Sequence, residues 1–357
     1  MIYKWNILLK EIINNMKNLL KIIVLTIMIL TIVMSVPSFG EMKKLAQVGF
    51  KGLIMPIGAR EIGMGNAVVS VPTGPNSIFW NPAAITEISS NISFTFNYMN
   101  WIADVNYGAG AVVFGMENFG MIGVSFSVLD YGIFKGTRLM GLTTDSWMET
   151  GDFSPGEIAV GLAYANKVTD KFSFGGHIKY ARQDLGAGLE GDDRAQPLAI
   201  PFNLSIWAFD FGTLYYTGIR DLRIAMSFQN FSKELKYQIE SFPLPLMFRV
   251  GVAMNVLTIF WEESPNALTV ALDFQHPRDF SERMNMGAEY LYQNPTLKDL
   301  GINSLALRGG YKLGYDEESW AFGFGINAYG ARIDYAIQEF GIFDNVSSFS
   351  LGLDVNF

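Results

Sequence analysis

Residues 349–357 read Phe-Ser-Leu-Gly-Leu-Asp-Val-Asn-Phe, so that large apolar residues alternate with small or polar ones. A period of two is typical of a β-strand, because successive side chains point to opposite faces of the sheet. The same pattern recurs in residues 158–164, 172–180, 284–290 and 333–337. The sequence therefore predicts a protein built mainly from strands, each with one apolar and one polar face.

Two all-β architectures produce this alternation. A soluble β-sandwich buries its apolar face, whereas a membrane β-barrel turns that face to lipid and its polar face to the lumen. The barrel is favoured by a predicted export signal, by Phe357 ending the last strand, and by aromatic residues near strand ends, namely Tyr164, Tyr180, Tyr290, Tyr292 and Tyr311. A terminal aromatic residue on such a strand resembles the signal that outer-membrane barrels present to their assembly machinery. We therefore predict an all-β, antiparallel transmembrane barrel.

The predicted barrel occupies residues 91–357 and has about fourteen strands, an even number as in bacterial outer-membrane barrels. If the first strand runs outward, the two longest connections, 130–155 and 184–202, both lie outside the cell, where long loops are expected. The expected strands are 92–101, 105–115, 120–129, 156–166, 172–183, 203–216, 222–232, 245–256, 267–274, 283–292, 303–312, 320–328, 331–338 and 348–357.

An apolar run of 13 residues, 22–34, follows Lys17 and Lys21. It is shorter than the ~20 residues that a spanning helix needs, and it fits the core of a secretory signal peptide better than a buried core helix. We predict a signal peptide over residues 1–40, with Met16 as an alternative initiator. An exported chain that forms a barrel is expected in the outer membrane.

The composition excludes several classes of function. Of the 357 residues, 50% are hydrophobic and 17% charged, and the formal net charge of −8 is poorly suited to nucleic acid, whose phosphates require Lys and Arg. The absence of cysteine excludes thiolate metal sites, disulfides and cysteine nucleophiles, and two histidines, His177 and His276, provide no cluster for a metal. We therefore expect neither an enzyme nor a metal or other cofactor.

A glycine-rich segment, residues 41–90, lies between the predicted signal and the barrel. Within it, Asn81-Pro82 predicts a rigid turn, since Asn can bond its own backbone and Pro fixes φ. This segment resembles the N-terminal hatch, or plug, of the FadL-like (OmpP1) superfamily, and is more closely similar to the PorV/PorQ family of outer-membrane proteins. The residues that carry the resemblance are Arg60, Gly63, Gly65, Ala67, Trp80, Asn81, Pro82 and Ala83.

Four motifs in the C-terminal third resemble motifs of the same family in the same order. They are His-Pro-Arg-Asp at 276–279, Gly-Ala-Glu-Tyr at 287–290, Leu-Arg-Gly-Gly-Tyr at 307–311 and Arg-Ile-Asp-Tyr-Ala at 332–336. The resemblance covers nearly the whole chain after residue 40. It implies a hatch over residues 41–90 followed by a barrel over residues 91–357.

Charged residues on the polar strand faces are expected to point into the lumen. There, opposite charges can pair and anchor the hatch, and we interpret Arg60 as a tether of the same kind. The alternative is a lumen lining that selects a permeant or senses a ligand. The residues concerned are His177, Lys179, Arg249, Asp273, Glu289, Arg308, Lys312, Arg332, Asp334 and Asp354.

The resemblance to PorV and PorQ implies a non-enzymatic partner of type IX protein secretion and surface attachment. Secreted proteins with C-terminal sorting domains, and other secretion components, would then bind the outer loops 130–155, with Trp147, and 233–244. The alternative is a FadL-like passive transporter of hydrophobic small molecules, opened by movement of the hatch around Asn81-Pro82. In either case the expected partners include outer-membrane lipids and the outer-membrane assembly machinery.

Overall fold

The computed structural model describes residues 48–116, 119–139, 147–190, 198–237, 240–261 and 264–356, all within one compact unit of the chain. The predicted signal peptide, residues 41–47 of the predicted hatch, and Phe357 lie outside the described residues. Among the described residues, no helix has the length and apolar character needed to cross a membrane.

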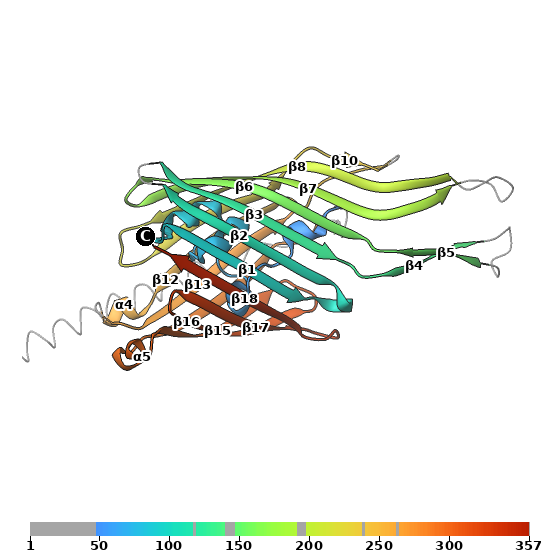
Figure 1. Ribbon diagram of the computed structural model, residues 1–357. Coiled ribbons are helices and arrows are strands. Elements are labelled where there is room, and N and C mark those ends of the chain that lie inside the picture. The colour runs from blue at the N-terminus through green and yellow to red at the C-terminus, as the bar shows by residue number, and fades with distance from the viewer. Residues whose placement is uncertain are drawn as a thin grey trace, which may run out of the picture. The chain divides into compact units, whose positions relative to one another are not determined.

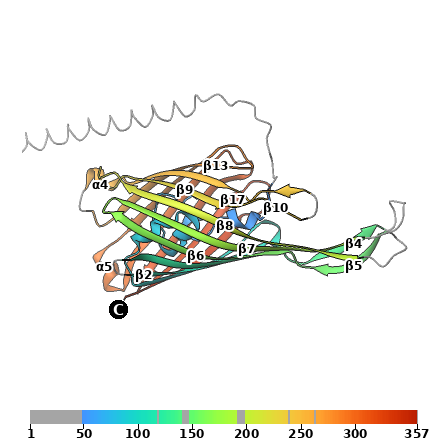
Figure 2. The ribbon, with the colours of Figure 1, turned by 90° about the horizontal axis from the view of Figure 1, so that it is seen from above.

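The described residues form a closed antiparallel β-barrel of fourteen strands, in which β1 pairs with β18 to complete the ring (Figures 1 and 2). The fold class predicted from the alternation is confirmed. The barrel strands are β1 (Ile92–Asn100), β2 (Asn106–Met116), β3 (Gly120–Asp130), β6 (Gly156–Thr169), β7 (Phe172–Glu190), β8 (Leu198–Tyr216), β9 (Arg223–Phe231), β12 (Met247–Asn255), β13 (Ala267–Pro277), β14 (Arg283–Tyr292), β15 (Ile302–Leu313), β16 (Glu318–Ala328), β17 (Ala331–Phe340) and β18 (Val346–Val355).

Each of the fourteen predicted strands corresponds to a barrel strand, but the longest predicted loops are partly sheet. Strands β7 and β8 keep pairing beyond the barrel, from Asp184↔Asn203 through a register shift to Glu190↔Leu198. The predicted loop 130–155 contains a separate hairpin of β4 (Phe134–Leu139) and β5 (Trp147–Phe153). These ribbons form because paired strands satisfy one another's backbone groups without a barrel beneath them.

The barrel has two distinct ends. We call the end that carries the β4–β5 hairpin the outer end, and the end at which β18 finishes the inner end (Figure 1). The outer end also carries the strands β10 (Leu235–Lys236) and β11 (Ser241–Phe242). Two short helices, α4 (Leu257–Phe260) and α5 (Pro295–Asp299), lie in connections at the inner end (Figure 1).

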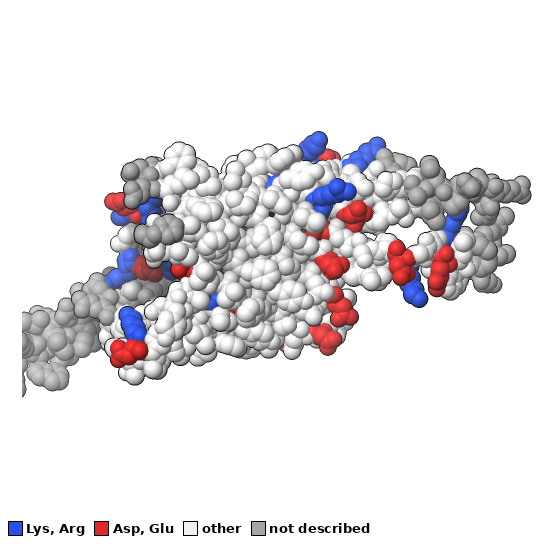
Figure 3. Space-filling model, in the orientation of Figure 1, with Lys and Arg blue, Asp and Glu red and all other residues white. Residues whose placement is uncertain are grey.

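Large apolar side chains cover the outside of the barrel. Leu307, Phe322 and Trp207 are 65%, 62% and 58% exposed, while their strand neighbours Arg308, Ala321 and Ala208 are buried. On the face seen in Figure 3 the charged residues gather toward the two ends and the central surface is free of them. An apolar outer band around a polar interior is the arrangement of a membrane barrel, because hydrocarbon cannot hydrate charge.

Residues 48–91, which we call the luminal segment, fill the inside of the barrel (Figure 2). The segment starts at the outer end, where the Gly49 amide donates to the Pro243 carbonyl at 3.2 Å, and finishes where the Asn91 amide reaches Asn356. Its short helices are η1 (Lys51–Ile54), α2 (Ala59–Gly63), η2 (Gly74–Asn76), α3 (Ser77–Trp80) and η3 (Pro82–Glu87). Most of these residues are buried, so the segment supplies the core that the barrel wall alone lacks.

Candidate functional site

A cavity of about 500 Å³ opens at the outer end of the barrel, above the luminal segment. We call it the outer cavity. Its walls are mainly apolar and aromatic, as in most small-molecule sites. They come from the luminal segment, from strand ends and from the connections between them, and include Ile54, Met55, Trp80, Trp101, Ile102, Val105, Leu129, Tyr131, Met247, Phe280, Tyr315 and Phe340.

The aromatic walls are held in place by packing between connections that lie far apart in the sequence. Trp101, which follows β1, meets Phe340 at the end of β17 edge to face, with ring centroids 4.7 Å apart. Ile102 and Val105 belong to the turn around η4 (Ile102–Asp104), and both line the cavity. This part of the wall is therefore built where the two sides of the closed ring, β1–β2 and β17–β18, come together.

Two guanidinium groups lie at the same cavity. Arg283 is 4.2 Å from the ring centres of both Phe280 and Tyr315, and Arg249 is 5.2 Å from that of Trp80. Among the described residues, the Nε atom of neither group has a hydrogen-bond partner. The cavity therefore offers cations over aromatic faces, an arrangement that stabilises both groups and leaves Nε atoms free to donate.

Tyr315 lines the outer cavity beneath the guanidinium group of Arg283. Burial, and then the Glu318 carboxylate, raise the pKa of Tyr315 to about 12, so its phenol stays neutral at physiological pH. Its hydroxyl donates to Gln275 Oε1 at 3.4 Å. Two further charged groups line the cavity, and both are paired. Lys51 pairs with Asp279, and Glu318 pairs with Lys312.

The Asn81-Pro82 turn holds the luminal segment against the barrel wall. The Asn81 amide donates to the carbonyls of Val69 and Thr213, at 2.9 and 3.0 Å, while its oxygen accepts from the Ala83 amide at 3.1 Å. Pro82 packs on Gly175, where a Cβ atom would lie 2.6 Å from the Pro82 carbonyl carbon. Only glycine at that wall position allows so close an approach.

Replacing Asn81 with alanine is expected to lower the free energy of unfolding by about 2 kcal/mol, since three buried hydrogen bonds are lost together. The measurement is thermal unfolding of the purified protein in detergent. Asn294→Ala is the matched control, because Asn294 also caps a Pro-containing turn through its side chain, but this hydrogen bond is exposed and lies in a connection outside the lumen. Equal losses for both variants would contradict the anchoring role of Asn81.

Arg60 and Glu289 join the luminal segment to the opposite part of the wall. Arg60 donates from Nε and Nη2 to the two Glu289 oxygens, at 2.8 and 2.7 Å. Arg308 donates to the same carboxylate at 2.6 Å and to Asp334 at 2.7 Å. Four of the charges singled out from the sequence therefore form one chain that crosses from α2 to β14, β15 and β17.

The glycines of the predicted hatch motif lie where backbones meet. A Cβ atom on Gly63 would lie 3.0 Å from the Gly323 Cα atom, and Gly65, at φ +61°, sits against the backbone of Gly310. The inward charges Arg332 and Asp354 pair separately near the inner end, at 3.4 Å. The structure thus divides the sequence-predicted residues between several contacts rather than one site.

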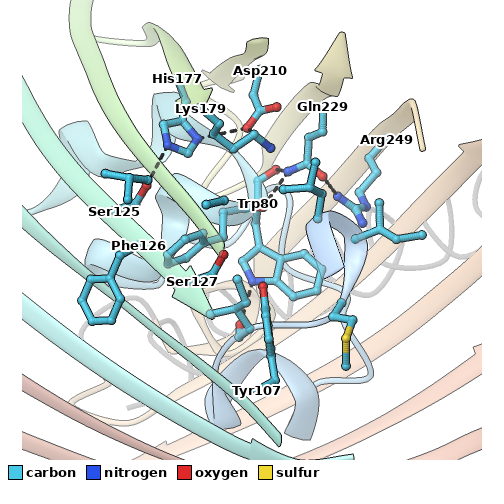
Figure 4. A pocket seen from close by; sticks show the side chains of 17 residues that line it. Trp80, Tyr107, Ser125, Phe126, Ser127, His177, Lys179, Asp210, Gln229 and Arg249 are labelled. Carbon is cyan, nitrogen blue, oxygen red and sulfur yellow. Dashed lines mark hydrogen bonds and ion pairs between the residues drawn. The ribbon is translucent and has the colours of Figure 1, made fainter. Parts of the chain in front are cut away.

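A second polar cluster joins three strands (Figure 4). Its members His177 and Lys179 were expected to point into the lumen, whereas their partners Ser125 and Asp210 were missed by sequence reasoning. Ser125 Oγ lies 2.8 Å from His177 Nε2, and His177 Nδ1 lies 3.0 Å from Asp210, which also pairs with Lys179 at 2.8 Å. Gly161 makes this possible, because a Cβ atom there would lie 2.1 Å from His177 Nε2. The contacts of Ser125 and Asp210 with His177 could not be predicted from the order of residues, because they depend on the strand register.

The Ser125–His177–Asp210 line has the order of a hydrolase relay, but its surroundings favour a structural role. The three residues are at most 3% exposed, and Asp210 also accepts from Lys179 and from the Asn230 amide. The neighbouring cavity measures only about 30 Å³, roughly the space of one water molecule. Among the described residues, no cluster of His, Asp and Glu is arranged to hold a metal ion.

Glu61 is a buried acid within the luminal segment. It is fully buried in α2, its Oε2 accepts from the Asn76 amide at 3.4 Å, and its Oε1 has no partner. Burial raises the pKa of Glu61 from 4.5 to about 7, because a buried carboxylate loses its hydration. The folded protein therefore holds a proton on Glu61 that the unfolded chain would release.

Raising the pH from 5 to 7 is expected to lower the free energy of unfolding by about 2 kcal/mol through Glu61. The stabilisation is complete below the unfolded value of 4.5 and is lost as the pH rises through the folded value of about 7. The measurement is the melting temperature in detergent at several pH values. Glu61→Gln should show a shallower decline; an unchanged slope would contradict the assignment.

The geometry defines a membrane-type barrel with an internal segment and an apolar cavity at its outer end. No family model and no curated relative matches the chain. Solved structures do match it. It is similar to the toluene transporter TbuX of Ralstonia pickettii, with 14% identity, a TM-score of 0.52, and coverage of 84% of this chain and 98% of that one.

Two further structures give the same result. The CymD monoaromatic hydrocarbon channel matches with 11% identity and a TM-score of 0.54, over 84% of this chain and 98% of that one. A FadL homologue of Pseudomonas aeruginosa matches with 11% identity and a TM-score of 0.50, over the same shares of the two chains. The fold is therefore that of the FadL-type outer-membrane barrels.

Proposed function

We infer that the protein is a passive outer-membrane channel for small apolar molecules, aromatic ones in particular. The observation that carries this proposal is the outer cavity, with about 500 Å³ of space and aromatic walls at the outer end of a FadL-type barrel. That TbuX is a toluene transporter and CymD a monoaromatic hydrocarbon channel supports the same class of passenger.

The cavity suits transient binding. Removing a benzene-sized ring from water, roughly 200 Å², is worth about 5 kcal/mol, and much of that gain is offset by the lost freedom of the bound molecule. The remaining affinity is weak, as a channel requires if its passenger is to leave again. The rings of Trp101, Phe280 and Phe340 offer faces and edges against which an aromatic passenger can pack.

The proposal is tested by uptake into cells, because the lipopolysaccharide leaflet is the barrier that such molecules meet. We expect a host with intact lipopolysaccharide to take up radiolabelled toluene faster when it expresses the protein than when it carries an empty vector. A second labelled solute, hydrophilic and of similar size, serves as the control for general leakiness. Equal toluene uptake in both strains, with the protein present in the outer membrane, would refute the proposal.

A role in type IX secretion, as in PorV and PorQ, is a second and weaker proposal. The solved structures described above are transporters and channels, so the support for it lies in the surface of the outer loops. Ile133, which precedes the β4–β5 hairpin, and Trp147, the first residue of β5, are 76% and 61% exposed. Exposed apolar side chains of this kind are typical of protein-binding surfaces.

Affinity purification from detergent-solubilised membranes tests this second proposal. The expected result is recovery of secreted proteins that share one C-terminal domain, and loss of that recovery when residues 132–154 are replaced by a short turn. Recovery of the same proteins by the shortened variant would exclude the hairpin as their docking surface. A barrel that purifies without such proteins would contradict the secretion role, and the channel would then be the remaining proposal.

A further inference from the structure

The outer cavity has a small neighbour deeper in the barrel. This inner cavity, of about 30 Å³, lies beside the Ser125–His177–Asp210 cluster (Figure 4). The two cavities share four lining residues, Ile54, Met55, Trp80 and Arg249. These four side chains therefore form the partition between them.

Trp80 is the largest side chain of the partition and the most firmly held. It is 4% exposed, and its Nε1 donates to the Ile57 carbonyl at 2.9 Å. Its own carbonyl accepts from Ser227 at 2.7 Å and from Gln229 at 2.9 Å, which fixes the backbone to β9. Figure 4 shows the indole of Trp80 among the side chains of the inner cavity, with Ser125, His177 and Asp210 on one side of it and Arg249 on another.

Arg249 completes the hold on the indole. Its guanidinium lies over the Trp80 ring and donates a hydrogen bond to Gln229. The ring therefore packs between this cation and the luminal segment. A cation over an aromatic face stabilises that face in its position, more so where water is excluded. These contacts to its ring, its nitrogen and its backbone hold the side chain between the two cavities in the structure.

The chemistry on the two sides of the indole differs. The outer cavity is walled largely by aromatic rings. The inner cavity has apolar side chains such as Leu53, Phe79 and Phe126 on part of its wall, but it also has the polar side chains of Ser125, Ser127, His177 and Lys179. A hydrated ion that passed the indole would therefore find polar partners in the inner cavity. The indole is thus placed where the channel can discriminate between polar and apolar passengers.

The following assignment rests on the proposed channel function. We propose that Trp80 is the specificity-determining residue of the channel, and that its indole keeps water-borne solutes of the outer cavity out of the polar interior. A passenger with an aromatic ring can replace the indole beneath Arg249, because it offers that cation an equivalent face. A hydrated solute cannot, and is retained outside.

The absence of cysteine from the sequence allows a direct test. Ser127 lines the inner cavity and not the outer one, so Ser127→Cys places a single thiol behind the partition. Intact cells are treated from outside with a charged, membrane-impermeant methanethiosulfonate, and the mass of the purified protein reports labelling. With Trp80 present we expect slow labelling; with Trp80→Ala added, labelling should be at least about tenfold faster.

Three controls separate a partition from a general loss of structure. Trp80→Phe keeps a ring and should stay slow, and Trp101→Ala, which removes a tryptophan of the outer cavity alone, should also stay slow. Ser173→Cys reports on the seating of the luminal segment near the inner end, where Ser173 contacts Thr86 at 2.9 Å. That thiol should remain protected in the Trp80→Ala background.

Equal labelling of the Ser127 thiol with and without Trp80 would overturn the assignment. Fast labelling of both thiols in Trp80→Ala would also overturn it, since the indole would then act by holding the whole segment. The labelling test needs no transported passenger. Its failure therefore leaves the channel proposal intact, and failure of toluene uptake leaves the labelling result intact.

Discussion

Replacing Glu289 with alanine is expected to lower the free energy of unfolding by about 3–5 kcal/mol, the usual cost of leaving buried charges without their partner. Glu289 is fully buried and accepts from both Arg60 and Arg308. Its loss leaves two guanidinium groups in the lumen with one remaining carboxylate, Asp334, on Arg308. The luminal segment loses its tether in the same step.

The measurement is the temperature at which the purified barrel changes its migration on a gel, or the denaturant midpoint in detergent. Glu339→Ala is the matched control, because Glu339 accepts from Ser319 at 2.7 Å on the exposed surface. Exposed contacts of this kind are worth little. Similar midpoints for both variants would show that the Arg60–Glu289 pair does not hold the segment in place.

Replacing Leu351 with arginine is expected to destabilise the membrane-inserted barrel by about 2–4 kcal/mol, the cost of a charge at mid-membrane depth on the lipid side. Leu351 lies in the middle of β18, is 44% exposed, and pairs across the wall with Ile333 and Phe96. The expected observation is a reduced yield of folded barrel in lipid vesicles and a lower denaturant midpoint there.

Ser347→Arg provides the comparison for this second variant. Ser347 lies four residues before Leu351 in the same strand, closer to the outer end and on the same face. It pairs with Asn100. Arginine near the membrane surface costs only about 0–1 kcal/mol, since its charge can reach water. Equal penalties for the two variants would contradict the placement of the apolar band across the membrane.

The barrel could be predicted from the sequence because its two faces meet different environments. Lipid outside and the packed luminal segment inside impose opposite demands on neighbouring residues, and a period of two survives in nearly every strand. The end of β7 escaped prediction because Gly186 and Gly188 resemble a loop, whereas the structure uses them in a twisted ribbon beyond the barrel. Glycine composition alone does not distinguish the two.

The outer cavity could not be predicted in the same way. Trp101 and Phe280 come from two separate connections and Phe340 from the end of β17, and no periodicity links them. The Ser125–His177–Asp210 cluster depends on strand register and on a missing side chain at Gly161. By contrast, the Asn81-Pro82 turn could be predicted from its local chemistry. Its partners in the barrel wall, Gly175 and Gly212, lie far along the chain and could not.

The central claim is that apolar aromatic molecules enter through the outer cavity. It is tested most directly by uptake of the fluorescent probe N-phenyl-1-naphthylamine in cells that express one of two matched variants. Val105→Trp fills the outer cavity from its wall, while Val124→Trp makes the same substitution on the lipid-facing side, where Val124 is 43% exposed. We predict that Val105→Trp reduces uptake to the level of cells without the protein and that Val124→Trp takes up the probe like the wild type. Undiminished uptake by a folded Val105→Trp barrel would contradict the account.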